Sequence, residues 1–163
     1  SMKYWPGLGW ALVLLDFIIV KRDWQKDAAN VQGMYGRILS RNAPFWLLIF
    51  PEGTRLTHEK IKRSQNFACQ HNLPELQHVL LPRTKGFVTA LTSLREKVDA
   101  VYDLTINYRE GVPSLWSVAS GAPCQVVLTV RRYPLSVLPA KDEKIKMWLY
   151  QRFVEKNKLL EAL

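Results

Sequence analysis

The stretch that decides the fold runs from Phe45 to Arg55 and reads FWLLIFPEGTR. Its first part, Phe45–Phe50, is entirely apolar and rich in aromatic and branched side chains, and Pro51 ends the run. A short apolar run that is closed by proline predicts a buried β-strand rather than a helix. Open α/β folds place their ligand sites in the turns that follow such strands. The sequence therefore predicts a ligand site directly after this strand.

The turn after the predicted strand, Pro51–Arg55, combines backbone freedom with groups that bind anions. Gly53 allows the backbone to approach a ligand closely. Thr54 offers a hydroxyl, and Arg55 can donate two parallel hydrogen bonds to a phosphate. The alternative is a plain strand-end turn in which Glu52 and Arg55 pair with each other.

The hexapeptide Phe50–Arg55, FPEGTR, resembles the third sequence block of the glycerolipid acyltransferases, the lysophosphatidic acid acyltransferase superfamily. The second block of that family, an apolar strand closed by a basic residue, is similar to Phe17–Val20 followed by Arg22. The segment Leu80–Phe87, LLPRTKGF, resembles the branch that includes the lysocardiolipin and lysophosphatidylinositol acyltransferases. Its Lys85 stands where that branch has a basic residue after the third block. For Arg22 and Lys85 the alternative is ordinary solvated charge.

This resemblance implies an enzyme that moves an acyl group from a coenzyme A thioester to a free hydroxyl of a lysophospholipid. The acceptor would be lysophosphatidic acid or a related anionic lysolipid. The residues that the resemblance assigns to its phosphate are Arg22, Arg55 and Lys85. The motif loop comprises Phe50, Pro51, Glu52, Gly53 and Thr54, in which Gly53 and Thr54 would meet developing negative charge and Glu52 would support the loop. Acyl-coenzyme A is a co-substrate, and neither cofactor nor metal is implied.

The first block of the family, a His followed after four residues by an Asp, has no counterpart in this sequence. The His of that block serves as general base, and the Asp orients it. The residues five positions after His58, His71 and His78 are Arg63, Leu76 and Arg83. We therefore expect an inactive fragment of a longer enzyme, with the catalytic pair upstream of Ser1. The alternative is a non-catalytic module that binds anionic lipid.

Composition restricts the partners without choosing one. The chain has 163 residues and a formal net charge of +9, which suits a phosphorylated lipid, an anionic membrane surface or nucleic acid. Nucleic acid is the weakest of these, because the aromatic residues lie mostly in apolar runs and not on a stacking platform. Cys69 and Cys124 are in no paired spacing, which favours a reducing compartment. We expect a membrane-associated parent protein at the endoplasmic reticulum, with this domain facing that compartment.

The predicted fold is a single α/β domain with a mostly parallel central sheet flanked by helices, as in glycerol-3-phosphate acyltransferases. The acyltransferase domain would span residues 3–139, and a C-terminal amphipathic helix would occupy residues 140–163. Apolar surface near the N-terminus, around Trp5, Trp10 and Leu14, would favour self-association. The other predicted strands are Ala100–Asn107 and Cys124–Arg132, and the other predicted helices are Asp23–Arg41, His58–His71, one after Phe87 through about Glu96, and one from Lys141 onward.

Two finer expectations concern the C-terminal half of the chain. The segment Arg109–Gly121 is predicted to be a loop in which Trp116 is a candidate lipid contact. In the strand after it, Gln125 and Thr129 are expected to point outward, with apolar neighbours facing the core.

Overall fold

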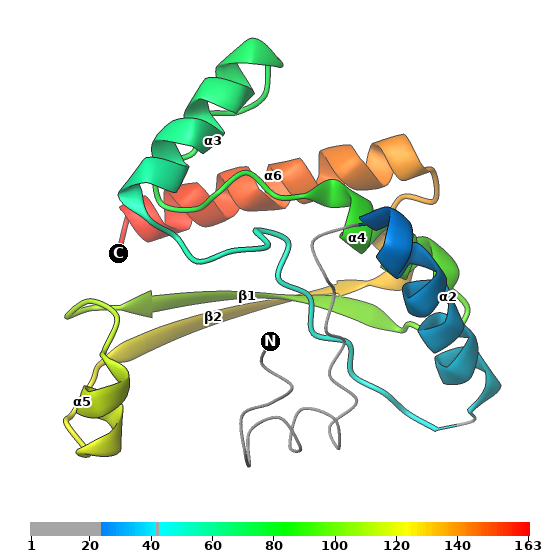
Figure 1. Cartoon of the computed structure of the whole chain (residues 1–163), viewed down its shortest axis with the longest axis horizontal. Helices are drawn as coiled ribbons and strands as arrows, with labels where there is room; N and C mark the ends of the chain where they lie inside the picture. Colours follow the sequence, from blue (N-terminus) through cyan, green and yellow to red (C-terminus); the bar gives the residue numbers. More distant parts are fainter. Residues whose placement is uncertain (1–23, 42) are drawn as a thin grey trace. The chain divides into compact units, whose positions relative to one another are not determined.

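The computed structural model describes residues 24–41 and 43–163, which form helices and one small sheet (Figure 1). These residues fall into two compact units. Helix α2 (Trp24–Ser40) belongs to the unit that ends at Phe45, and every other described element belongs to the unit Trp46–Leu163. The mixture of helices and strands confirms the α/β class.

Helix α2 matches the helix predicted over Asp23–Arg41. Val31 and Tyr35 are buried, and Ile38 is half-buried on the same side, three and four residues apart. This spacing places the apolar side chains on one face of the helix. The predicted strand Phe17–Val20 lies outside the described residues.

The prediction of a buried strand over Phe45–Phe50 is wrong for the described structure. The segment forms no ladder with another described strand, and Trp46 is 85% exposed. Its side chains still alternate, because Trp46, Leu48 and Phe50 are exposed while Ile49 packs against the core. A strand requires a neighbouring backbone to satisfy its N–H and C=O groups, and the apolar side chains of one segment cannot supply that partner.

The sheet consists of two antiparallel strands, β1 (Ala100–Tyr108) and β2 (Val126–Pro134). Ala100 lies opposite Pro134 at the base of this ribbon, and Tyr108 lies opposite Val126 at its far end. Both strands were predicted, although β2 begins and ends two residues later than expected. The described residues contain no parallel central sheet, which corrects that part of the predicted fold.

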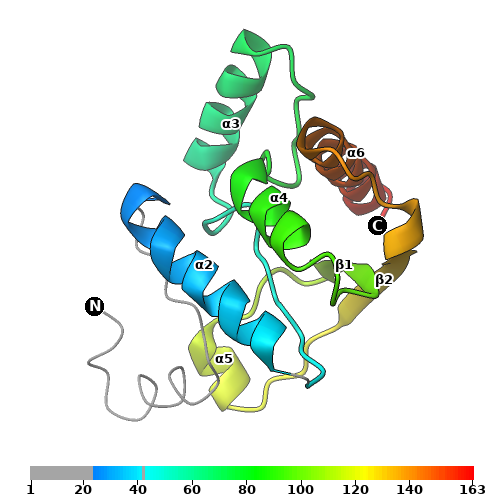
Figure 2. The ribbon, with the colours of Figure 1, turned by 90° about the vertical axis from the view of Figure 1, so that its right-hand side faces the viewer.

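The core of the second unit lies where α4 (Thr84–Ser93) and α6 (Asp142–Glu161) pack together (Figure 2). Apolar side chains recur along α6 at helical spacing, so Ile145, Leu149 and Phe153 are all buried. Trp148 stacks on Phe87 of α4, with ring centroids 5.8 Å apart. The buried cluster comprises Leu76, Val79, Phe87, Val88, Leu91, Leu138, Ile145, Leu149 and Phe153. The predicted apolar stripe of the last helix is therefore confirmed.

Three further elements complete the described chain. Helix α3 (His58–Gln70) begins as predicted, with the Thr57 hydroxyl accepting a hydrogen bond from the Lys60 amide. The connection between β1 and β2, predicted to be a loop, contains a short helix, α5 (Leu115–Ala119), which Ser114 caps. A 3₁₀ turn, η2 (Leu135–Val137), follows β2.

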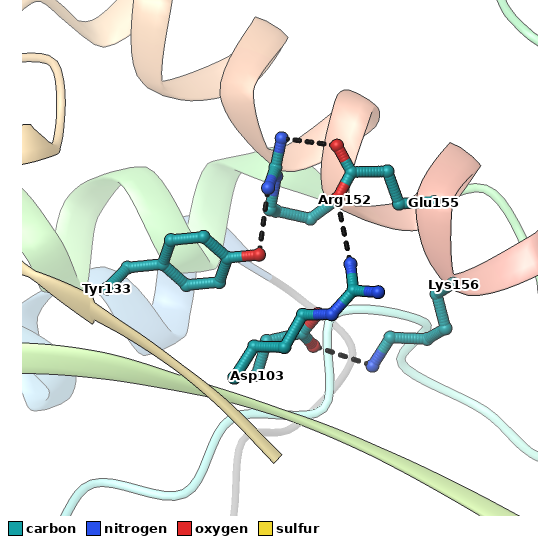
Figure 3. A network of polar contacts seen from close by, with 6 residues as sticks. Asp103, Tyr133, Arg152, Glu155 and Lys156 are labelled. Atoms are coloured by element: carbon teal, nitrogen blue, oxygen red, sulfur yellow. Dashed lines mark hydrogen bonds and ion pairs between the residues drawn. The ribbon is translucent and has the colours of Figure 1, made fainter. Parts of the chain in front are cut away.

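Polar side chains join the ribbon to α6 (Figure 3). Lys156 forms an ion pair of 2.7 Å with Asp103 of β1, and Arg131 of β2 forms one of 3.0 Å with Glu155. Arg152 donates a hydrogen bond to the hydroxyl of Tyr133 over 2.8 Å. These contacts all use odd-numbered strand residues, which point to one face of the ribbon.

The opposite face of the ribbon is apolar and exposed. Thr129 was expected to point outward, but it is half-buried. It lies on the face whose polar residues, Asp103 and Arg131, form ion pairs with α6. The expectation that Gln125 would be exposed is confirmed. The exposed apolar residues of the ribbon are Tyr102, Leu104, Ile106, Val126, Leu128 and Val130.

Candidate functional site

The loop Pro51–Arg55 is a tight turn whose shape depends on glycine. The Gly53 amide donates a hydrogen bond of 3.0 Å to the carbonyl of Phe50. Gly53 has φ +66°, in the left-handed region that residues with a Cβ atom rarely adopt. The FPEGTR sequence therefore folds locally into a compact turn that exposes its backbone.

Two hydrogen bonds attach this turn to the segment that precedes α4. The Arg83 amide donates to the Pro51 carbonyl over 2.8 Å. The Leu80 amide donates to the carboxylate Oε2 of Glu52 over 3.0 Å, and Leu80 is itself buried. Glu52 thus connects two segments that lie 28 residues apart in sequence, and its described contact is with backbone.

Helix α3 holds the other side of the turn through Lys60. Its ammonium group donates to the hydroxyl of Thr54 over 2.6 Å and to the carbonyl of Arg55 over 3.2 Å. The same helix reaches the segment before α4, because the Leu81 amide donates to the Ser64 hydroxyl over 2.9 Å. The loop is therefore fixed from two directions within the second unit.

The side chain of Arg83 lies against Gly53. A Cβ atom at Gly53 would come within 3.3 Å of the Arg83 Cδ atom, so a larger residue would displace this exposed side chain by a few tenths of an ångström, whereas the φ angle itself favours glycine. Arg83, Lys60 and Arg55 bring three positive charges to one loop, and Arg55 and Arg83 are exposed. Helix α4 begins directly after Arg83, and no side chain caps it. Its first amides add a partial positive charge, so the loop region favours an anion.

Two of the three predicted phosphate-binding residues lie within the described part of the structure. Arg55 lies on the loop, and Lys85 is exposed in the first turn of α4, two residues beyond Arg83. Arg22 lies outside the described residues, so its predicted convergence with Arg55 stays a prediction. Lys60 and Arg83, which also approach the loop, were not among the predicted site residues. The sequence did contain one clue, because Gly53 lets another segment come close to the loop. This clue does not identify Arg83 as the residue that does so.

Replacing Glu52 with Ala is expected to lower the free energy of unfolding by about 1–3 kcal/mol, because the buried Leu80 amide loses its acceptor. Glu52→Gln keeps a carbonyl oxygen that can accept, so its loss should be smaller. Urea unfolding followed by circular dichroism measures both. Equal losses for Ala and Gln would show that the Glu52–Leu80 contact contributes nothing specific.

Other features of the described residues do not add to this site. A shallow hollow near the far end of the ribbon is lined by residues including His78, Tyr108 and Leu160, and the turn Pro51–Arg55 does not contribute to it. Within residues 24–41 and 43–163, no group of three His, Cys, Asp or Glu residues is arranged to hold a metal ion. Across the same residues, the helices are too short or too polar to span a bilayer.

Comparison with known proteins identifies the class. Residues 1–109 match the family model described as Acyltransferase, and residues 117–163 match the model described as Acyltransferase C-terminus. The first match covers well over half of the chain, and it includes the FPEGTR loop and the Leu80–Phe87 segment. The chain belongs to the acyltransferase family.

Three relatives show how far the similarity extends along the chain. The chain is 38% identical over 161 residues to 1-acyl-sn-glycerol-3-phosphate acyltransferase 3 of Arabidopsis thaliana, covering 98% of this chain and 43% of the relative. It is 38% identical to the human 1-acyl-sn-glycerol-3-phosphate acyltransferase gamma, over 99% of this chain and 43% of that protein. It is 36% identical to mouse lysocardiolipin acyltransferase 1, over 99% and 44%. The chain thus spans less than half the length of these relatives. No solved structure matches it.

Proposed function

We propose that this chain binds the phosphate of a lysophospholipid for an acyltransferase that uses acyl-coenzyme A as donor. The acceptor is lysophosphatidic acid or a related anionic lysolipid. The protein works at a membrane surface, and its parent resides at the endoplasmic reticulum with this domain on the reducing side. The names of the relatives support the substrate class.

The observation that carries the proposal is the loop of positive charge at Pro51–Arg55. Three cations meet at this loop, whereas the carboxylate of Glu52 is directed to a backbone amide. A phosphate monoester offers oxygens for several charge-assisted hydrogen bonds, and arginine can donate two of them in parallel. Arg55 is exposed and lies on the motif itself, so we assign it the central contact.

Replacing Arg55 with Ala should weaken the binding of short-chain lysophosphatidic acid about 10- to 100-fold, because hydrogen bonds to charged groups contribute about 1.5–3 kcal/mol. Arg63→Ala is the matched control, since Arg63 is also an exposed arginine but lies on α3. Isothermal titration calorimetry measures both, beside zwitterionic lysophosphatidylcholine as a second ligand. Equal weakening by the two substitutions, or equal affinity for the two lipids, would contradict the assigned site.

A non-catalytic anionic-lipid-binding module is the second candidate function. The absence of a His–Asp pair at the family spacing in these 163 residues favours it. Both candidates share the phosphate site, so the binding experiment supports either. They differ in whether an acyl group is transferred by the parent protein.

A further inference from the structure

We propose that the connection between β1 and β2, residues 109–125, is a membrane-docking tip that inserts its apolar side chains into the interfacial region of an anionic bilayer. This inference deepens the proposed function and rests on it for the choice of a lipid partner. It adds a surface, separate from the phosphate loop, that holds the domain against the bilayer in which its substrate resides.

The tip exposes large apolar side chains where solvent-facing loops usually carry polar ones. Trp116 is 82% exposed, and Val112 and Val118 are also largely exposed. Trp116 and Val118 lie on the short helix α5 and Val112 precedes it; α5 lies at the free end of the ribbon, away from the α4–α6 core (Figure 1). Tryptophan is enriched where membranes meet water, because its ring is apolar and its indole N–H can still reach a polar partner.

Charge is almost absent from this segment of the chain. Among the 27 residues from Leu104 to Val130, only Arg109 and Glu110 are charged, whereas the chain's charged fraction of 23% would give about six. Moving a charged side chain into lipid is costly, so an inserting segment must lack charge. The run Gly111–Gln125 within the tip meets that condition, and Arg109 and Glu110 mark the depth at which insertion stops.

The surroundings of the tip favour lipid with negative headgroups. The exposed face of the ribbon, with Ile106 and Leu128, continues the apolar surface from the tip along both strands. On this face the next charge along β2 is basic, Arg132, which lies opposite Tyr102, and the whole chain carries a net charge of +9. Basic residues near an apolar insertion strengthen binding to anionic lipid. An anionic bilayer therefore matches both the apolar surface of the tip and the positive net charge of the chain.

The two cysteines provide matched probes for the test. Cys124 lies within the tip and Cys69 lies on α3, and both are exposed free thiols. A nitrobenzoxadiazole label is attached to Cys124 in the Cys69→Ser chain, and to Cys69 in the Cys124→Ser chain. Each is mixed with vesicles of phosphatidylcholine containing about 30 mol % phosphatidic acid, and with vesicles of phosphatidylcholine alone. We expect blue-shifted emission and protection from iodide quenching at Cys124 only, and a stronger response with phosphatidic acid.

A matched pair of substitutions isolates the tip. Val118 and Val137 are 61% and 63% exposed, but Val137 lies in η2 beyond the base of the ribbon. Val118→Asp should weaken vesicle binding about tenfold or more, since it puts a charge into the inserted surface. Val137→Asp should leave binding within about twofold.

Each remaining outcome decides the proposal. Equal responses at Cys124 and Cys69, vesicle binding without a Cys124 response, or no vesicle binding would overturn it. Shielding of Cys124 before vesicles are added would show that the tip is covered by protein instead, and would also overturn it. The calorimetric titration with lysophosphatidic acid is independent of these readouts. A chain that docks through the tip but does not bind this lysolipid would overturn the proposed function and leave the tip in place.

Discussion

Mixed with acyl-coenzyme A and lysophosphatidic acid, this 163-residue chain is expected to release coenzyme A thiol no faster than the same chain carrying Arg55→Ala. The human 1-acyl-sn-glycerol-3-phosphate acyltransferase gamma, assayed in parallel, should release the thiol about 10²–10⁴-fold faster or more. This factor is the usual contribution of a general base to the rate. A thiol-reactive dye measures the release continuously.

The expected lack of turnover has a physical reason, which is that none of the three histidines is placed to act as a general base. None precedes an acidic residue at the family spacing. The Nδ1 atom of His71 lies 2.9 Å from the Phe67 carbonyl, and its ring stacks on that of Phe67. Among the described residues, no carboxylate is hydrogen-bonded to His58, His71 or His78 to orient an imidazole for proton abstraction. Turnover that Arg55→Ala abolishes would show that these residues contain a working base, contrary to this expectation.

Replacing Ile145 with Ala should lower the free energy of unfolding by about 2–5 kcal/mol, the range for removing a large aliphatic side chain from a packed core. Ile145 is 0% exposed and lies in the buried cluster between α4 and α6. The loss would be a large part of the about 5–15 kcal/mol that stabilises a typical domain. Urea unfolding followed by circular dichroism should show a lower midpoint with an unchanged slope.

Met147 provides the matched control for this core prediction. It lies two residues further along α6 and is 64% exposed. Met147→Ala shortens a side chain on the same helix by a similar amount, but it should change stability by no more than about 0.5 kcal/mol. Similar losses for the two substitutions would mean that α6 is not held by the apolar stripe that contains Ile145.

The sequence by itself determined the family, the longer helices and both strands of the ribbon. Helix α3 begins where Thr57 can cap it, and α6 follows from the apolar spacing of Ile145, Leu149 and Phe153. Such signals are local, since a cap or a stripe is complete within one or two turns of the chain. The FPEGTR motif likewise identified the loop, because its turn depends on Gly53 and its charge on Arg55.

Only the tertiary structure decided which segments meet. The apolar pattern of Phe45–Phe50 predicted a strand, but strand formation depends on a partner backbone that this pattern does not specify. The orientation of the ribbon was also undetermined locally, since either face of an alternating strand can turn inward. In the folded chain the face that carries Val101 and Tyr133 packs against the core, and Asp103 and Arg131 of the same face form ion pairs with α6. In the same way, Arg83 reaches Gly53 because long-range packing brings Leu80–Arg83 beside the loop, and no periodicity in the sequence encodes a contact across that distance.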